Sequence, residues 1–297
     1  MADPKALLSI IRPQNCIIGG LTVIAGIAIA YVQAPVGAIE SYTHVFLYGY
    51  LTYFFVAAGG NIVNDIFDIE VDKINRPHRA LPSGRMTVRE AWAYVGFNSV
   101  LGVFFAWLNG FYGTLLVILF LGVGYVYAAK VKTLGIAGNF MVAFSFAFGV
   151  IYGSFIYAEM ISSFVIPVPT WLFFVTAFMI LQARETIKGA EDVEGDRLRN
   201  VRTIARVHGF RAAAVVQLLL NLLGVVCYTL IWVLGFASWD LWLLLVTGVI
   251  VVLAAGIVPL TGPSNKSRLK MASTLDKVGA LIGLVAFVLI PLYSILW

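Results

Sequence analysis

Two short acidic phrases carry the clearest chemical signal in this sequence. The first places Asp68 and Asp72 four residues apart, and the second repeats this spacing with Asp192 and Asp196, 124 positions later. Each phrase follows a long apolar run, in a chain that is 61% hydrophobic and only 12% charged. Ionised carboxylates beside such segments are costly unless they are paired, hydrated or bound to a cation. The pattern therefore predicts a site for divalent metal ions.

The residues around each phrase recur at the spacing of one face of an α-helix. The polar positions of the first face are Asn61, Asn64, Asp65, Asp68 and Asp72. The matching positions of the second face are Glu185, Lys188, Gly189, Asp192 and Asp196. Carboxylate oxygens without an imidazole or thiolate cluster favour Mg²⁺ over zinc or copper. A single acidic loop is often merely solvated, but two loops with matching spacing favour a metal site.

Basic residues surround both phrases. They are Arg76, Arg79 and Arg85 after the first phrase, Lys188 before the second, Arg197, Arg199 and Arg202 after it, and Lys130 and Lys132 at the end of another predicted helix. Arginine and lysine bind phosphate oxygens through charge-assisted hydrogen bonds. Metal-bearing carboxylates within a ring of cations would therefore form a clamp for a diphosphate.

The apolar segments that must position these residues are long enough to cross a membrane, which takes about 20 mostly apolar residues per helix. The mean hydropathy of the chain is +0.93. The predicted spans are 13–32, 44–67, 90–108, 111–129, 137–158, 170–189, 211–234, 240–260 and 277–297. We therefore predict an all-α, multi-pass membrane protein, in which nine helices of a single domain, residues 1–297, surround a central cavity.

The distribution of charge supports this count of helices. All 20 lysines and arginines lie at the N-terminus or in the connections after the second, fourth, sixth and eighth helices, including the helix ends. The connections on the other side carry only Glu40, Glu159 and Asp240. Because positively charged loops stay inside the cell, we expect a cell-membrane protein with its N-terminus and both acidic phrases in the cytoplasm, and its C-terminus outside.

A shift of 124 positions also places the second and third helices over the sixth and seventh. This predicts two pseudo-repeated four-helix units followed by a ninth helix. The connections 68–89 and 190–210 both begin with acidic residues and then become rich in arginine. We expect them to cap the cavity on its cytoplasmic side and to close over a substrate.

Composition excludes several other classes of protein. The two cysteines, Cys16 and Cys227, lie in apolar segments and predict neither a disulfide framework nor a metal site. The net charge of +5 comes from basic residues in short connections. These residues indicate membrane topology and phosphate binding, and we expect no nucleic-acid partner.

At the acidic phrases the sequence resembles the UbiA superfamily of intramembrane prenyltransferases. The family pattern Asn-Asp-x-x-Asp-x-x-x-Asp is matched from Asn64 to Asp72, and the second pattern, Asp-x-x-x-Asp, by Asp192 and Asp196. The resemblance covers nearly the whole chain, including the positions of both motifs after the second and sixth helices. It implies Mg²⁺-dependent transfer of a prenyl group from an allylic diphosphate to an acceptor.

The resemblance also implies roles for individual residues. The aspartates expected to act in catalysis and to bind two Mg²⁺ ions, with Asn64 as a further ligand, are Asp65, Asp68, Asp72, Asp192 and Asp196. The residues expected to bind the substrates are Arg12, Asn15, Asn61, Asn64, Arg76, Arg79, Lys130 and Lys188. Arg12, Lys132 and Arg202 are candidates for an acceptor phosphate. Glu185, whose role does not come from the resemblance, is a candidate ligand support or proton acceptor, but a salt bridge with Lys188 is the favoured role.

Within the superfamily, three segments resemble the archaeal digeranylgeranylglyceryl phosphate synthases. They are 11–16, 74–84 and 187–196. This likeness implies geranylgeranyl diphosphate as the donor and geranylgeranylglyceryl phosphate, a lipid with a free hydroxyl, as the acceptor in ether-lipid synthesis. One departure is Ala190, where many relatives carry Asp, so this position offers neither a base nor a ligand here.

Other readings stay open at this point. A ring-prenylating enzyme of the quinone, haem or chlorophyll branch would carry the same motifs. A secondary transporter would also show internal repeats and intramembrane polar residues, but its site would lie near the midplane rather than at one face. An intramembrane aspartyl protease would need a Gly-x-Gly-Asp phrase, which the sequence lacks.

Overall fold

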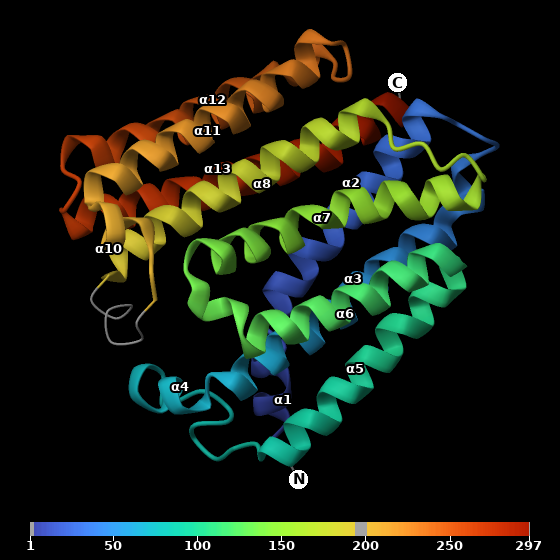
Figure 1. Ribbon diagram of the computed structural model, residues 1–297. Coiled ribbons are helices and arrows are strands. Elements are labelled where there is room, and N and C mark those ends of the chain that lie inside the picture. Colours follow the sequence, from blue (N-terminus) through green and yellow to red (C-terminus); the bar gives the residue numbers. More distant parts are fainter. Residues whose placement is uncertain (1–2, 194–200, 297) are drawn as a thin grey trace.

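The computed structural model describes residues 3–193 and 201–296, and within these residues the regular structure is entirely helical. Figure 1 shows the long helices running side by side. The long helices are α2 (Pro13–Gln33), α3 (Thr43–Phe67), α5 (Val88–Asn109), α6 (Phe111–Ala129), α7 (Ile136–Met160), α8 (Val168–Glu191), α11 (Phe210–Val233), α12 (Trp242–Ile257) and α13 (Lys266–Leu296). The short α-helices are α1 (Pro4–Ile10), α4 (Ile69–Asn75) and α10 (Ile204–His208).

Four 3₁₀ helices complete the described regular structure: η1 (Ile39–Tyr42), η2 (Val131–Leu134), η3 (Trp239–Leu241) and η4 (Val258–Thr261). Eight helical segments of the described chain are long and apolar enough to cross a membrane. Helix α8, with 24 residues, is as long as most of these, but Gln182, Arg184 and Glu185 make its second half polar. The all-helical prediction is confirmed, but the count of nine membrane-spanning helices is not: the described residues contain eight apolar spans, and α8 is a further long helix of mixed character.

Most predicted spans agree with the helices to within about two residues, which is the usual uncertainty of helix ends. The exception is the last helix, which begins at Lys266 and not near 277. Its first three turns contain Lys266, Lys270 and Asp276. A search for apolar runs therefore detects only the later part of α13.

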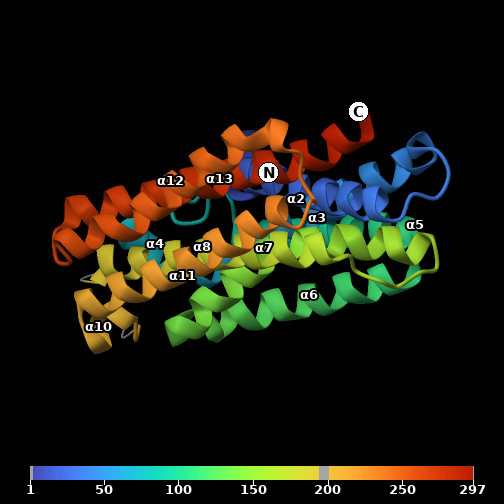
Figure 2. The same cartoon turned by 90° about the horizontal axis from the view of Figure 1, so that it is seen from above.

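The chain ends lie at opposite ends of the helix bundle. The short helices α1, α4 and α10 lie at one end, and the C-terminus lies at the other (Figure 1). The view from above shows that the long helices keep a common direction through the molecule (Figure 2). Because consecutive long helices alternate in direction, the ends of α3 and α8 and the starts of α2 and α13 come together at the end that holds α4.

Helices α2 and α7 form a close seam. A Cβ atom added at Gly26 would lie 2.1 Å from the carbonyl oxygen of Val150, and one added at Gly153 would lie 2.1 Å from that of Val23. The hydroxyl of Ser154 donates to the Gly26 carbonyl oxygen at 2.8 Å. Small residues allow such an approach of helix backbones, which is the usual way that membrane helices pack.

At the opposite end from α4, a carboxylate from one helix caps another. Glu159, near the end of α7, accepts the backbone N–H groups of Tyr112 and Gly113 at the start of α6, both at 2.8 Å. These amides would otherwise lack partners, and the negative charge suits the positive end of the helix dipole. One of the three acidic residues on this side of the chain therefore joins two helices.

Candidate active site

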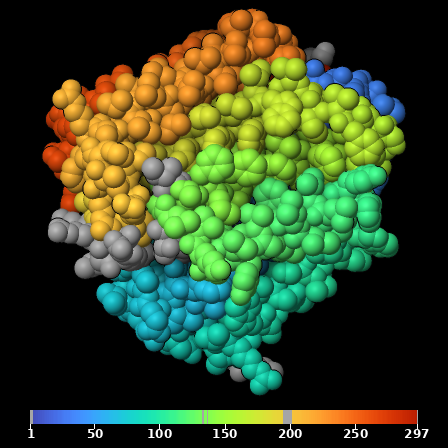
Figure 3. All heavy atoms as spheres, viewed as in Figure 1, coloured from blue at the N-terminus to red at the C-terminus, as the bar shows by residue number. Residues whose placement is uncertain are grey.

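A cavity of about 1620 Å³ opens between the helices. Residues of α2 through α8 and of α13 line it, whereas α11 and α12 contribute none of the described lining residues. Its charged lining residues are Arg12, Asp68, Asp72, Arg76, Arg79, Arg184, Glu185, Lys188, Glu191, Asp192, Lys266 and Lys277. In the space-filling view, the segment around α4 (cyan) and that around α10 (amber) lie near each other, at the end of the bundle opposite the C-terminus (Figure 3).

The opposite part of the cavity is apolar and aromatic. Its lining residues include Phe120, Phe148, Tyr152, Leu284 and Phe287. The rings of Phe120 and Phe148 stack with their centroids 4.6 Å apart. The cavity thus joins a charged end to an apolar interior, which suits a ligand with a charged head and a hydrocarbon chain.

Asp68 and Asp192 occupy equivalent positions on two different helices. Asp68 is the C-cap of α3 with φ −95° and ψ 1°, and Asp192 is the C-cap of α8 with φ −95° and ψ 13°. Each backbone N–H donates to the carbonyl oxygen four residues earlier, of Asn64 at 3.1 Å and of Lys188 at 2.9 Å. Both aspartates line the cavity. The two acidic phrases therefore begin with the same local geometry.

The first acidic phrase does not continue as one unbroken helix, contrary to the expectation of a single face. Helix α3 ends at Phe67, and α4 begins at Ile69 after the cap at Asp68. Four of the five predicted polar positions line the cavity: Asn61, Asn64, Asp68 and Asp72. Asp65 does not; it is only 5% exposed and faces two arginines.

Arg79 links the two buried carboxylates of this phrase. Its Nη1 donates to Asp72 Oδ2 at 2.6 Å and lies 3.2 Å from Asp65 Oδ1. Arg12 donates to the same Asp65 oxygen. Asp72, like Asp65, is 5% exposed. Charge-assisted bonds to buried carboxylates hold an arginine in a fixed place, so the side chains of Arg12 and Arg79 are ordered at the cavity wall.

The predicted asparagines all line the cavity, but their contacts differ. Asn61 donates through Nδ2 to the carbonyl oxygen of Ile11 at 2.8 Å and so holds the segment before α2. The Oδ1 atom of Asn64 is buried and has no hydrogen-bond partner among the described residues. Asn15 lies on the first turn of α2. A buried acceptor without a partner is rare and marks Asn64 as a place for a ligand.

The basic residues predicted near the phrases divide into two groups. Arg76, Arg79 and Lys188 line the cavity, whereas Lys130, Arg85 and Arg202 are not among its lining residues. Arg85 instead donates to the carbonyl oxygen of His78 at 2.6 Å. The side chain of Lys132 lies outside the described part of the structure, as do the residues Asp196, Arg197 and Arg199.

Glu185 has a different partner from the one predicted. Its Oε1 atom accepts Nη1 of Arg184 at 2.7 Å, so the expected salt bridge with Lys188 is not the one that the structure contains. A residue adjacent in sequence reaches Glu185, and both side chains line the cavity. Spacing along a helix face favours the pair three residues apart only where no nearer cation competes.

Three cations of the cavity wall were not among the predicted site residues: Arg184, Lys266 and Lys277. Lys266 and Lys277 both belong to α13 and stand eleven residues apart, which is about three helical turns and places them on one face. This spacing is a signal present in the sequence. The start of α13 is so polar, however, that a search for apolar runs leaves it outside the predicted helix.

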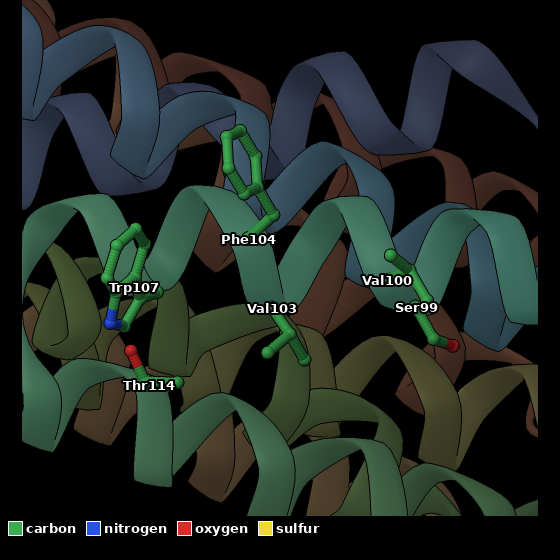
Figure 4. Close-up of a pocket in the computed structure, with 6 residues that line it drawn as sticks. All are labelled: Ser99, Val100, Val103, Phe104, Trp107 and Thr114. Carbon is green, nitrogen blue, oxygen red and sulfur yellow. The ribbon is translucent and has the colours of Figure 1, made fainter.

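A second hollow lies on the outer surface of α5 and α6. It holds about 490 Å³ and is lined by Ser99, Val100, Val103, Phe104, Trp107 and Thr114 (Figure 4). Trp107 is 65% and Val100 is 68% exposed. No charged residue lines this groove, so it offers nothing to hold a diphosphate. It is the kind of surface that hydrocarbon chains of a bilayer cover.

Among the described residues, no group of three or more Asp, Glu, His or Cys side chains is assembled into a ready metal site. Asp65 and Asp72 are instead held by arginine, and Asp196 of the second phrase falls outside the described residues. The cavity nevertheless offers three aspartates: Asp68, Asp72 and Asp192. These are hard oxygen donors of the type that Mg²⁺ binds together with water and phosphate oxygens.

The sequence of this chain matches one family of known proteins. The sequence profile of the UbiA prenyltransferase family matches residues 20–272. A digeranylgeranylglyceryl phosphate synthase of Thermococcus kodakarensis is 32% identical over 288 residues, which cover 97% of this chain and 98% of the relative.

Two solved structures have folds similar to that of this chain. A structure of digeranylgeranylglyceryl phosphate synthase superposes with a TM-score of 0.78 at 27% identity, covering 97% of this chain and 98% of the other. A UbiA homologue from Archaeoglobus fulgidus, bound to GPP and Mg²⁺, superposes with a TM-score of 0.59 at 16% identity, covering 95% and 99%. The second likeness concerns the fold alone.

Proposed function

Because this chain belongs to the UbiA prenyltransferase family, we propose that it transfers a geranylgeranyl group to the free hydroxyl of geranylgeranylglyceryl phosphate. The observation that carries this proposal is the cavity. One continuous space has carboxylates and arginines at one end and aromatic side chains in its interior. An allylic diphosphate with a long isoprenoid chain has the same division between a charged head and an apolar tail.

The choice of acceptor rests on the relatives. The Thermococcus kodakarensis protein, which matches along nearly its whole length, bears the name digeranylgeranylglyceryl phosphate synthase. The solved structure with the TM-score of 0.78 carries the same name. The acceptor is therefore proposed to be a phosphorylated glycerol ether, and the product would carry a second isoprenoid chain. An aromatic acceptor is the alternative that the experiment below must separate.

The donor set of the cavity fits Mg²⁺. Asp68, Asp72 and Asp192 line it, and the buried Oδ1 of Asn64 has no partner among the described residues. We propose that these residues, with Asp196 of the second phrase, hold two Mg²⁺ ions. When bound, the metal supplies positive charge against the diphosphate and so favours departure of the leaving group. The A. fulgidus homologue, with GPP and Mg²⁺ bound, has a similar fold.

The protein's own cations would complete the clamp. Arg76, Arg79 and Lys188 line the cavity beside the aspartates. As the allylic C–O bond breaks, negative charge grows on the leaving diphosphate, and fixed cations there lower the barrier. The acceptor oxygen then forms the new ether bond to the allylic carbon, and its proton passes to the released diphosphate. The apolar interior would orient the donor chain and keep water from the allylic carbon.

Asp65 has a different environment from the other aspartates of its phrase. It does not line the cavity, and Arg12 and Arg79 surround its carboxylate. The motif predicts direct metal binding by Asp65, but these contacts favour a role in holding the two arginines. We therefore propose Asp65 as a positioning residue for the arginines that face the diphosphate.

We propose an orientation for this multi-pass membrane protein from the positions of its basic residues. The charged end of the cavity carries the basic connections, which the positive-inside rule assigns to the cytoplasm. The N-terminus would then lie in the cytoplasm and the C-terminus outside. Both substrates carry phosphate groups, which would reach the charged end of the cavity from the cytoplasmic side.

A transfer assay with purified protein tests the proposal. Geranylgeranyl diphosphate is incubated with geranylgeranylglyceryl phosphate, or with an aromatic acceptor, and the lipid products are separated by mass. We expect prenylation of the glycerol ether only, loss of turnover in EDTA, and recovery with added Mg²⁺. Turnover that persists without divalent metal contradicts the metal role, and transfer to the aromatic acceptor alone contradicts the acceptor.

A further inference from the structure

Lys277 is a cation inside the last membrane helix. It stands eleven residues after the start of α13, or about 16 Å along the helix axis at 1.5 Å per residue. Helix α13 is one of the eight segments apolar enough to span a membrane, and Lys277 lines the cavity. An ionised lysine at such a position is costly unless it faces a watery cavity or a partner, and it usually marks a functional site.

Helix α13 is held so that Lys277 faces the cavity. The preceding residue, Asp276, is 0% exposed and accepts Nε2 of Gln217 at 2.7 Å and Nδ2 of Asn221 at 2.9 Å. Both donors belong to α11, which does not line the cavity. Because neighbouring residues of a helix project about 100° apart, the anchor at Asp276 fixes the direction of Lys277.

A second cation lies on the neighbouring wall. Arg184 of α8 lines the same cavity, and its buried Nε has no hydrogen-bond partner among the described residues. Its Nη1 is occupied by Glu185, so an N–H donor remains for a ligand. Helices α8 and α13 belong to one packed core, in which Ile187 and Ala190 join Leu269 and Ala272. Asp276 also lies near enough to Arg184 to interact with it electrostatically.

The face of α13 changes character beyond Lys277. Toward the C-terminus, the residues of this helix that line the cavity are Val278, Ala280, Leu281, Gly283, Leu284 and Phe287. All of them are apolar or glycine. The helix therefore offers a cation at one level and an apolar surface along the next turns. A ligand with an anionic head and a hydrocarbon chain could lie along it.

Lys277 has no ion-pair or hydrogen-bond partner among the described residues. The cations near α4 differ in this respect, since Arg79 binds Asp65 and Asp72, and Arg12 binds Asp65. On that wall Arg79 is joined to Asp72, which is proposed to hold metal. The wall of α8 and α13 instead presents Lys277 without a carboxylate partner, which suits an anion that binds without metal.

We propose that Lys277 and Arg184 form a second anion subsite, which binds the phosphate monoester of the acceptor while the acceptor chain lies along α13. This inference rests on the proposed function and deepens it. It assigns the two phosphate-bearing substrates to two walls of one cavity. The subsite would distinguish a phosphorylated acceptor from the corresponding alcohol.

Equilibrium binding without donor tests this subsite separately from catalysis. The affinities of geranylgeranylglyceryl phosphate and of its dephosphorylated alcohol are measured for the purified full chain in phospholipid-free detergent. The variant is Lys277→Gln, and the matched control is Lys270→Gln, an exposed lysine of the same helix that does not line the cavity. Turnover of the unchanged protein is recorded alongside, because its absence would count against the proposed function and not against the subsite.

We expect Lys277→Gln to weaken binding of the phosphate by about 10-fold to 100-fold, as for the loss of one charged hydrogen bond. Binding of the alcohol and the KM for geranylgeranyl diphosphate should stay at the level of Lys270→Gln, and Lys277→Arg should retain most of the affinity. Equal affinities in the two glutamine variants would overturn the proposal. The proposal would also be overturned if the two glutamine variants differed only in the presence of anionic phospholipid. The subsite would then bind a bilayer headgroup and not the phosphate of the acceptor.

Discussion

Arg12 and Asp65 form an ion pair that joins the start of α2 to the last turn of α3 across 53 positions of sequence. Arg12 adopts a left-handed backbone conformation, with φ 52° and ψ 67°, immediately before Pro13. Such a conformation is unfavourable for a residue other than glycine, and particularly so before proline. The ion pair with a buried carboxylate holds the Arg12 side chain at this position.

Removing either partner of this pair should therefore affect both stability and substrate binding. We expect Asp65→Asn and Arg12→Gln to show a coupling energy of about 1–3 kcal/mol in a double-mutant cycle of unfolding, because the residues are in contact. The measurement is the unfolding midpoint of each variant in one detergent. Additive effects would contradict the coupling.

The proposed role of Asp65 makes a separate kinetic prediction. Asp65→Asn should raise the KM for the prenyl diphosphate, because Arg12 and Arg79 lose their common partner. The Mg²⁺ concentration for half-maximal activity should change little, whereas Asp72→Asn should raise it, since Asp72 lines the cavity. A large increase in the Mg²⁺ requirement of Asp65→Asn would instead make Asp65 a metal ligand.

Asp68 allows a closely matched comparison within one acidic phrase. Asp68→Asn keeps the shape of the side chain but removes its charge, and we expect turnover to fall by about 100-fold or more, as when an electrostatic contact to the transition state is lost. Glu70→Gln is the control, because Glu70 is exposed, pairs with Lys73 at 2.7 Å and does not line the cavity. Similar activities of the two variants, with both proteins folded, would contradict the assignment of Asp68.

Much of the fold can be predicted from sequence because apolar runs mark the helices. The predicted span 111–129 has the same ends as Phe111–Ala129, and 44–67 corresponds to Thr43–Phe67. The start of α13 cannot be found in this way, since its charged residues resemble a loop. Lys277 therefore appears in the sequence as the edge of a span, whereas in the structure it stands well inside a helix.

The candidate site is predictable to a lesser degree. Spacing identifies Asp68 and Asp192 as an equivalent pair, and both line the cavity. Spacing alone does not distinguish Asp65 from its neighbours, because its direction depends on Arg12 and Arg79, which other segments supply. Local periodicity describes one helix at a time, whereas ion pairs depend on how the helices meet.

Glu159 gives a prediction about stability alone. Glu159→Ala leaves the first amides of α6 without acceptors and should lower stability by about 1–2 kcal/mol, the usual effect of losing a helix cap. The KM values for both substrates should not change, because Glu159 does not line the cavity. Thermal unfolding and steady-state kinetics measure the two effects. Glu40→Ala, an exposed acid in η1, is the control, and an equal loss in both variants would contradict the cap.

The seam between α2 and α7 predicts a different kind of effect. Gly153→Ala would place a methyl group against the backbone of Val23 and should destabilise the protein by about 1–3 kcal/mol, as overpacking does. Gly122→Ala on α6 is the control, since a Cβ at that position meets no atom within 4 Å. Thermal unfolding of the two variants measures the difference. If Gly153→Ala kept the stability of the unchanged protein, the prediction would be wrong, because the helices could then separate without loss of stability.

The same seam also borders the cavity. Thr22 of α2 and Gly149 and Tyr152 of α7 line the cavity, and these helices can approach only because glycine occupies their contact points. A methyl group added at the seam would push the two helices apart and so change the width of the cavity between them. We therefore expect an exchange of a seam glycine to change the shape of the cavity without any contact between the new side chain and a substrate.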